Sequence, residues 1–205
     1  MEYSNETEEK ILKAAREIFI RDGRDGARME EIARHAGLNK ALLHYYFRSK
    51  EKLYRMVFQK EFQQVVSDLF QSLEPDLIFR DFLLSFINNY INRLQQHPHI
   101  VGFLLWEIRR GGEDFSVTIK NILLQNDGFL PEGIIKKINH AIQKKEIRAL
   151  DSRHLFMNLI AMCIYTFITE PLLSIIFPDV EVNSEKFLEI RKNEIFKLIW
   201  NGIQP

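Results

Sequence analysis

The sequence has very little cysteine, since Cys163 is the only one among its 205 residues. A single cysteine excludes an intrachain disulfide and the cysteine-rich zinc sites. No basic segment followed by an apolar core opens the chain, so we expect no signal peptide and a cytoplasmic protein. The longest apolar stretch, residues 155–177, is interrupted by polar side chains and by Pro171, which favours a buried helix over a membrane span.

Motifs that are typical of enzymes are also missing. The sequence contains no glycine-rich phosphate loop, no nucleophile elbow and no paired His–Glu metal motif. His97 and His99 flank a proline, and this spacing favours a loop between helices over a metal site. Cys163 lies on an apolar helix face, which favours a small core residue over a redox role. We therefore expect no enzymatic activity, no cofactor and no metal.

The charges are balanced overall, with 28 basic and 28 acidic residues. A net charge of zero does not exclude nucleic acid, because binding depends on local patches. Between residues 34 and 60 the only acid is Glu51. The basic residues of this segment are Arg34, Lys40, Arg48, Lys50, Lys52, Arg55 and Lys60.

Residues 29–52 carry the most informative pattern in the chain. Apolar residues at Ile32 and Ala33 predict one short helix, and those at Leu43 and Phe47 predict a second over about residues 40–46, with Gly37 in the turn between them. The second helix also carries hydrogen-bond donors and aromatic rings, including Asn39 at its start, which suit base edges and phosphates. This pattern predicts a helix-turn-helix unit whose second helix enters the major groove of DNA.

The same stretch resembles the DNA-binding domain of the TetR family of transcriptional regulators over roughly residues 7–54. The residues that carry the resemblance are Ile32, Ala33, Ala36, Gly37, Leu38, Asn39, Lys40, Leu43, Tyr46, Phe47, Ser49, Lys50 and Leu53, together with an expected helix over residues 11–20 that ends at Gly23. The resemblance implies an all-α fold. A three-helix helix-turn-helix domain over residues 1–50 would be followed by a helical bundle over residues 51–205 that binds an effector and forms a dimer.

The resemblance also implies residues that contact DNA. Those at matching positions are Lys40, Ala41, Leu42, His44, Tyr46 and Lys50. Lys40 can reach guanine or a phosphate, Lys50 is expected at the phosphate backbone, and Leu42 can contact a thymine methyl. Tyr45 is counted with the DNA-binding candidates, although packing is the preferred interpretation for it.

The sequence departs from the family where the helix near Met29 begins. A Ser or Thr usually caps this helix, but Ala27 and Arg28 stand there instead. Loss of a side-chain cap costs on the order of 1 kcal/mol. Two alternatives follow: Asp25 caps a helix that starts earlier, or Arg28 contacts a DNA phosphate.

The rest of the chain predicts helices without repeats. A helix over residues 50–72, capped by Ser49, is expected to link the two domains, and further helices are expected to begin at Pro75, Pro98, Pro131, Asp151 or Ser152, and Ser184. Pro171 is expected to kink or shorten the helix that contains it.

Aromatic and apolar residues of these helices are candidates for two further sites. The resemblance implies an effector pocket, and the candidate lining residues are Phe62, Phe86, Tyr90, Phe103, Trp106 and Tyr165, each of which also suits plain packing. Few charges lie near them, so we expect a largely apolar or aromatic ligand. The last two long helices carry more apolar residues than one face needs, which predicts a two-fold dimer. The candidate interface residues are Phe156, Ile160, Cys163, Ile164, Phe167, Ile195, Ile199 and Trp200.

The interpretation is a homodimeric repressor that binds a palindromic double-stranded DNA operator and is released by a small-molecule effector, with no membrane partner. Two alternatives remain. One is a helical enzyme or small-molecule-binding protein without DNA activity, which would show no salt-dependent binding to duplex DNA. The other is a structural module that only dimerises, which would tolerate the loss of Lys40 and Lys50.

Overall fold

The computed structural model describes residues 2–71, 76–110, 116–117, 119–122 and 132–205. Within these residues every regular element is a helix and no strand occurs, so the predicted all-α fold is confirmed. The chain divides into two compact units, residues 1–62 and 63–205, and the division lies inside one helix. Each unit is described by itself below.

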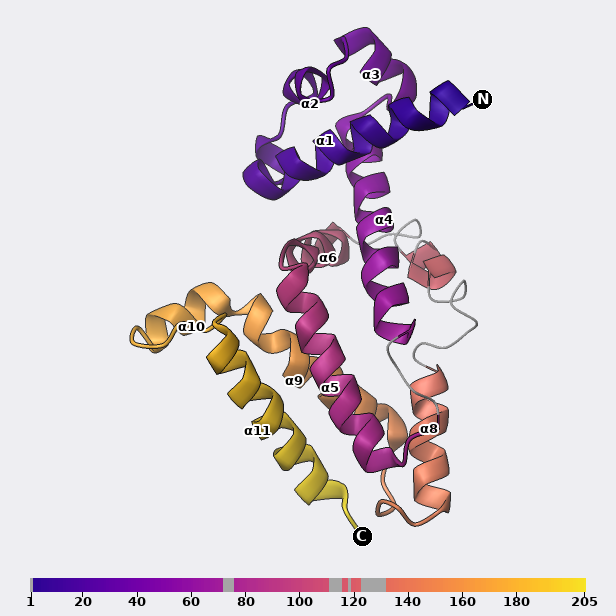
Figure 1. Cartoon of the computed structure of the whole chain (residues 1–205), viewed down its shortest axis with the longest axis vertical. Helices are drawn as coiled ribbons and strands as arrows, with labels where there is room; N and C mark the ends of the chain where they lie inside the picture. The colour runs from indigo at the N-terminus through magenta and orange to yellow at the C-terminus, as the bar shows by residue number, and fades with distance from the viewer. Residues whose placement is uncertain (1, 72–75, 111–115, 118, 123–131) are drawn as a thin grey trace. The chain divides into compact units, whose positions relative to one another are not determined.

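The described residues of the first unit form three helices and the beginning of a fourth (Figure 1). These are α1 (Glu2–Gly26), α2 (Met29–His35), α3 (Lys40–Tyr46) and the first part of α4 (Lys50–Gln71). Apolar residues on α1, including Ile11, Ala15 and Phe19, are fully buried because they recur on one helix face. The α1 helix deviates at Gly23, whose φ of 68° suits glycine.

The start of α4 packs on α1, which explains why the compact unit continues past residue 50. The rings of Phe19 and Tyr54 meet edge to face with their centroids 4.9 Å apart. Arg16 Nε lies 2.8 Å from the carboxylate of Glu61. Val57 and Phe58 are buried in the same unit. The first part of α4 is therefore held to the helix-turn-helix region by both apolar and charged contacts.

The second unit contains the remaining helices (Figure 1). These are the end of α4, then α5 (Phe79–Gln96), α6 (His99–Arg110), α8 (Glu132–Gln143), α9 (Ser152–Ile168), α10 (Glu170–Ile176) and α11 (Glu185–Ile203). Residues 116, 117 and 119–122 are also helical. Helix α5 packs on α8, α9 and α11, and their buried apolar side chains form one core. The expected helix starts at Pro75 and Pro131 lie outside the described residues.

Local capping positions agree with the sequence. Asp151 accepts hydrogen bonds from the Arg153 and His154 amides at the start of α9, and Ser184 accepts one from the Phe187 amide at the start of α11. The stretch that contains Pro171 is broken into α9 and α10, which are bent by 71°, as predicted. In the described part of the chain no single helix has both the length and the apolar composition needed to cross a membrane, and only this bent pair has them together.

Candidate nucleic-acid interface

The turn between α2 and α3 depends on a glycine. Gly37 has a φ of 70°, in the left-handed region that side chains with a Cβ rarely adopt. The Leu38 amide donates to the Ala33 carbonyl at 2.9 Å, and the Gly37 amide donates to the Arg34 carbonyl at 3.1 Å. This pair of bonds is the Schellman arrangement, which satisfies the last carbonyls of α2. The predicted position and role of Gly37 are therefore confirmed.

Helix α3 begins with a side-chain cap. The Asn39 side chain accepts a hydrogen bond from the Leu42 amide at 2.8 Å. Asn39 therefore caps the start of α3. The sequence had suggested it as a donor to base edges or phosphates. The predicted extent of α3, residues 40–46, agrees with the structure.

Two faces of α3 differ in burial. Leu43 and Phe47 are buried and pack α3 onto the core of the first unit. The opposite side is exposed and consists of Lys40, Ala41, His44 and Tyr45. These four positions follow an i, i+1, i+4, i+5 spacing and therefore share one helix face. We call this set the α3 outer face, and it presents a cation, an imidazole and a phenol beside one methyl group.

Two side chains differ from the sequence interpretation. Tyr45 is 80% exposed, so the preferred interpretation as a packing residue is wrong. Its ring lies edge to face with the Tyr46 ring, with the centroids 5.6 Å apart. Leu42 and Tyr46 are half-buried, because they lie at the border between the buried face and the α3 outer face. They can contact DNA only with part of their surface.

Lys40 already has an intramolecular partner. Its ammonium lies 2.5 Å from the Glu30 carboxylate of α2, and both side chains are largely exposed. The hydrogen bond from Lys40 is the main cause that lowers the pKa of Glu30 below its ordinary value. Glu30 therefore stays ionised at neutral pH, and a DNA phosphate must compete with it for Lys40.

The Lys50 side chain is hydrogen-bonded to the backbone between α1 and α2. Its ammonium donates to the Asp25 carbonyl at 3.1 Å and to the Ala27 carbonyl at 3.0 Å. The side chain is half-buried and holds this connection against the start of α4. The expected contact of Lys50 with the DNA backbone remains a prediction. Two N–H groups of the ammonium already donate to carbonyls, so only the third is available for a phosphate.

Other basic residues of the 34–60 segment are paired within the chain. Arg55 lies 3.2 Å from Glu51, and Lys60 lies 3.8 Å from Glu9. Exposed pairs of this kind contribute little to stability. They do reduce the positive charge that the start of α4 offers to a partner.

The missing cap of α2 is confirmed. Arg28 occupies the N-cap position with an extended backbone, and its side chain makes no capping hydrogen bond. Asp25 cannot serve as an earlier cap, because α2 starts at Met29. The remaining alternative, a contact of Arg28 with a DNA phosphate, stays a prediction.

Replacing Arg28 by Ser is expected to stabilise the protein and to weaken DNA binding. The hydroxyl would accept a hydrogen bond from an amide in the first turn of α2, which is worth about 0.5–2 kcal/mol. The lost guanidinium would remove one phosphate contact in each subunit. Urea unfolding and DNA titrations of the same variant measure both effects. Stabilisation with unchanged DNA affinity would show that Arg28 makes no contact with DNA.

The candidate effector residues lie in different surroundings. Phe86 is fully buried, and Tyr90 adjoins it with ring centroids 5.7 Å apart. Burial is the main cause that raises the pKa of Tyr90, with Cys163 as a second cause. Phe103 is buried and Trp106 is half-buried. Tyr165 is half exposed, and Phe62 stacks on Phe58 at the end of the first unit, so these two are not part of the Phe86–Tyr90 pair.

The candidate dimer residues also divide into groups. Cys163, Ile195 and Ile199 are buried inside their own chain and offer no surface to a second copy, so they belong to the core. Burial raises the pKa of the Cys163 thiol to about 12, which keeps it neutral. Residues that are half-buried on the same helices are Phe156, Ile160, Ile164, Phe167 and Trp200.

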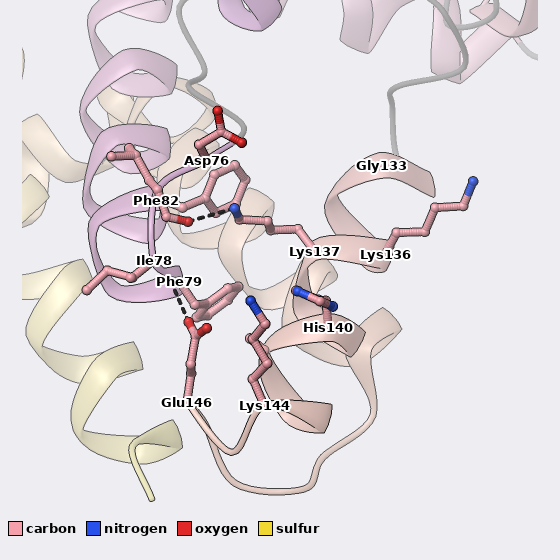
Figure 2. Close-up of a pocket in the computed structure, with 12 residues that line it drawn as sticks. Asp76, Ile78, Phe79, Phe82, Gly133, Lys136, Lys137, His140, Lys144 and Glu146 are labelled. Carbon is pink, nitrogen blue, oxygen red and sulfur yellow. Dashed lines mark hydrogen bonds between the residues drawn. The ribbon is translucent and has the colours of Figure 1, made fainter.

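One hollow in the second unit was not expected from the sequence. A cavity of about 390 Å³ lies beside α8 and the start of α5, and we call it the α8 cavity (Figure 2). Its lining includes Lys136, Lys137, His140 and Lys144. The spacing of residues 136, 140 and 144 is a helical i, i+4, i+8 series, which is the pattern that could have identified this basic side of α8.

Comparisons with known protein sequences match part of the chain. Residues 11–57 match the family model for bacterial regulatory proteins of the tetR family. The HTH-type transcriptional repressor NicS of Pseudomonas putida is 36% identical over 108 residues, which cover 51% of this chain and 49% of NicS. The HTH-type transcriptional repressor SCO4008 of Streptomyces coelicolor is 32% identical over 101 residues, 49% of each chain. The chain thus spans about half the length of these curated relatives.

Solved structures are similar over nearly the whole chain. A regulatory protein of the tetR family from Rhodococcus superposes with a TM-score of 0.73 at 15% identity, covering 97% of both chains. The regulator FadR from Bacillus subtilis, solved in complex with stearoyl-CoA, has a TM-score of 0.69 at 20% identity, covering 95% of this chain and 98% of FadR. Residues 11–57 are thus similar to the tetR family of bacterial regulatory proteins, and the helical fold is shared with solved proteins over nearly the whole chain.

Proposed function

We propose that this protein is a DNA-binding transcriptional regulator that acts as a repressor. The observation that carries the proposal is the α3 outer face, formed by Lys40, Ala41, His44 and Tyr45. It lies inside the segment that matches the family model, and NicS, which is 36% identical to this chain over 108 residues, is a transcriptional repressor. A helix that is anchored by Leu43 and presents donors on its free side suits the major groove. No catalytic role is proposed for any residue.

The regulator is proposed to act as a homodimer. One α3 helix reads only a short site, whereas two related by two-fold symmetry read a palindrome with half-sites about 34–36 Å apart. Apolar side chains that are at least one-third exposed lie on the last helices: Met157, Tyr165 and Ile168 on α9, Leu172, Ile175 and Ile176 on α10, and Ile190 and Leu198 on α11. We assign the dimer interface to this exposed apolar surface, and no longer to Cys163, Ile195 and Ile199, which are buried. A second copy would remove it from water.

A small molecule is proposed to control DNA binding. The relative FadR was solved with stearoyl-CoA, a ligand with a long apolar part. Here α5 carries a row of neighbouring rings, Phe79, Phe82, Phe86 and Tyr90, whose centroids are separated by 6.1, 6.2 and 5.7 Å in turn. Such a row suits an apolar or aromatic effector. Phe103 and Trp106 of α6 and Tyr165 of α9 remain candidates for the same ligand.

The effector is proposed to favour a conformation in which the two α3 helices no longer match successive major grooves. Helix α4 belongs to both units, so a displacement of its second part reaches its first part through one continuous helix. A coupling free energy of about 1–3 kcal/mol is enough to change occupancy of an operator several-fold.

Selection of bound duplexes from a random pool with the purified full-length protein tests the proposal. We expect enrichment of a palindromic sequence, with an affinity that falls steeply as salt concentration rises. A folded protein that enriches nothing at low salt would overturn it and would favour a small-molecule-binding protein without DNA activity. A dimer that enriches nothing would favour a module that only dimerises.

A further inference from the structure

The α8 cavity combines an apolar floor with a basic side. Phe79 and Phe82 of α5 and Ala141 of α8 are buried residues that line it. Its volume of about 390 Å³ lies at the lower end of the range of small-molecule sites. A ligand of modest size could therefore place an apolar part against two aromatic rings.

The cavity is held open by two hydrogen bonds that join segments distant in the sequence. Lys137 donates to the Leu77 carbonyl at 2.6 Å, and its ammonium lies 5.5 Å from the centroid of the Phe82 ring. The Phe79 amide donates to the Glu146 carboxylate at 2.8 Å. Figure 2 shows both bonds at the border of the hollow. These contacts fix the two sides of the cavity relative to each other before any ligand binds.

Two basic groups remain available inside this frame. His140 and Lys144 are one helical turn apart, and the Lys144 amide still donates to the His140 carbonyl at 2.9 Å. Within the described residues the side chains of His140 and Lys144 make no hydrogen bond or ion pair. Figure 2 shows Lys144 pointing toward the middle of the hollow with His140 beside it, whereas Lys136 points away.

The charges of the lining favour an anion. Its acids are Asp76 and Glu146, and Glu146 is already occupied by the Phe79 amide. The lining also contains three lysines and one histidine, so basic residues outnumber acids. Cationic donors on one side of a partly apolar cavity bind carboxylate and phosphate oxygens by charge-assisted hydrogen bonds.

We propose that the α8 cavity binds a small organic anion. Lys144 and His140 hold its carboxylate or phosphate, and its apolar part lies against Phe79 and Phe82. The inference deepens the proposed control by a small molecule and rests on it, because the site shares Phe79 and Phe82 with the aromatic row of α5. Phe82 also belongs to the aromatic row of α5, so an anion with a larger apolar part would extend toward Phe86.

Titration of the full-length protein with benzoate, phenyl phosphate and neutral benzamide tests the proposal, with methyl NMR of Ala141 and Ile78 as the readout. The measurement contains no DNA, so its outcome is separate from that of the duplex selection. We expect at least one of the two anions to shift both methyl groups and to bind about tenfold more tightly than benzamide, because a charge-assisted bond is lost in the amide. Preference between benzoate and phenyl phosphate identifies the head group.

Two variants locate the site. Lys144→Gln and His140→Gln are each expected to weaken anion binding about tenfold, since each replaces a basic donor to the oxyanion by a neutral amide. Lys186→Gln is the matched control, because Lys186 is an exposed lysine of α11 outside the cavity. Circular dichroism melting confirms that the exposed substitutions leave the fold intact. Equal binding of benzamide, unchanged binding by Lys144→Gln, shifts confined to other residues, or no shift at high millimolar anion would each overturn the proposal.

Discussion

Replacing Leu198 by Asp is expected to convert the proposed dimer into monomers and to lower operator affinity about a hundredfold or more. Leu198 is 65% exposed on α11, and Ile190, on the same helix face, is 55% exposed. In a two-fold interface the new carboxylate would be buried twice without a partner, which costs several kcal/mol. Sedimentation velocity measures the association state, and titration of the selected duplex measures the affinity.

The control for this experiment is Ile108→Asp. Ile108 is a 53% exposed aliphatic residue of α6, outside the exposed apolar surface. The Ile108→Asp substitution introduces the same charge into the same unit but outside the proposed interface. It should therefore leave dimerisation and DNA affinity unchanged. A Leu198→Asp protein that remains dimeric and binds the duplex normally would show that the interface lies elsewhere in the chain.

The parts of this fold that the sequence predicts well are those set by neighbouring residues. A cap such as Asp151 or Ser184 accepts hydrogen bonds from amides two or three residues away. Gly37 is needed because its own backbone has a positive φ. The buried face of α3 follows from the helical spacing of Leu43 and Phe47. Each of these features needs only local geometry, so a single sequence contains enough to locate it.

Other features depend on residues far apart in the chain. Lys50 bonds to carbonyls 25 and 23 residues earlier, and a sequence pattern gives no sign of those partners. Helix α9 is apolar on most of its surface, so periodicity could not separate the buried Cys163 from the exposed Met157. The α8 cavity likewise forms between α5 and α8, which the chain separates by more than a helix. Tertiary packing decides all three.

Replacing Lys40 by Ala is expected to lower DNA affinity about tenfold or more, and replacing Glu30 by Gln is expected to raise it. Lys40 leaves its ion pair with Glu30 when it contacts DNA, so removal of the carboxylate favours the bound state. If Lys40 contacts a phosphate, the slope of log affinity against log salt should fall by about 0.9 in each subunit. Titrations of the selected duplex at several salt concentrations measure both quantities.

The same variants decide what Lys40 recognises. A phosphate contact lowers affinity uniformly, whereas a guanine contact also relaxes the preference at one base pair of each half-site. Binding of Lys40→Ala to duplexes with every single base change separates the two. Lys60→Ala is the matched control, because Lys60 is an exposed lysine on α4 whose nearest carboxylate is 3.8 Å away. If Lys40→Ala behaves like Lys60→Ala, the α3 outer face does not meet DNA through Lys40, and the competition between Glu30 and DNA does not occur.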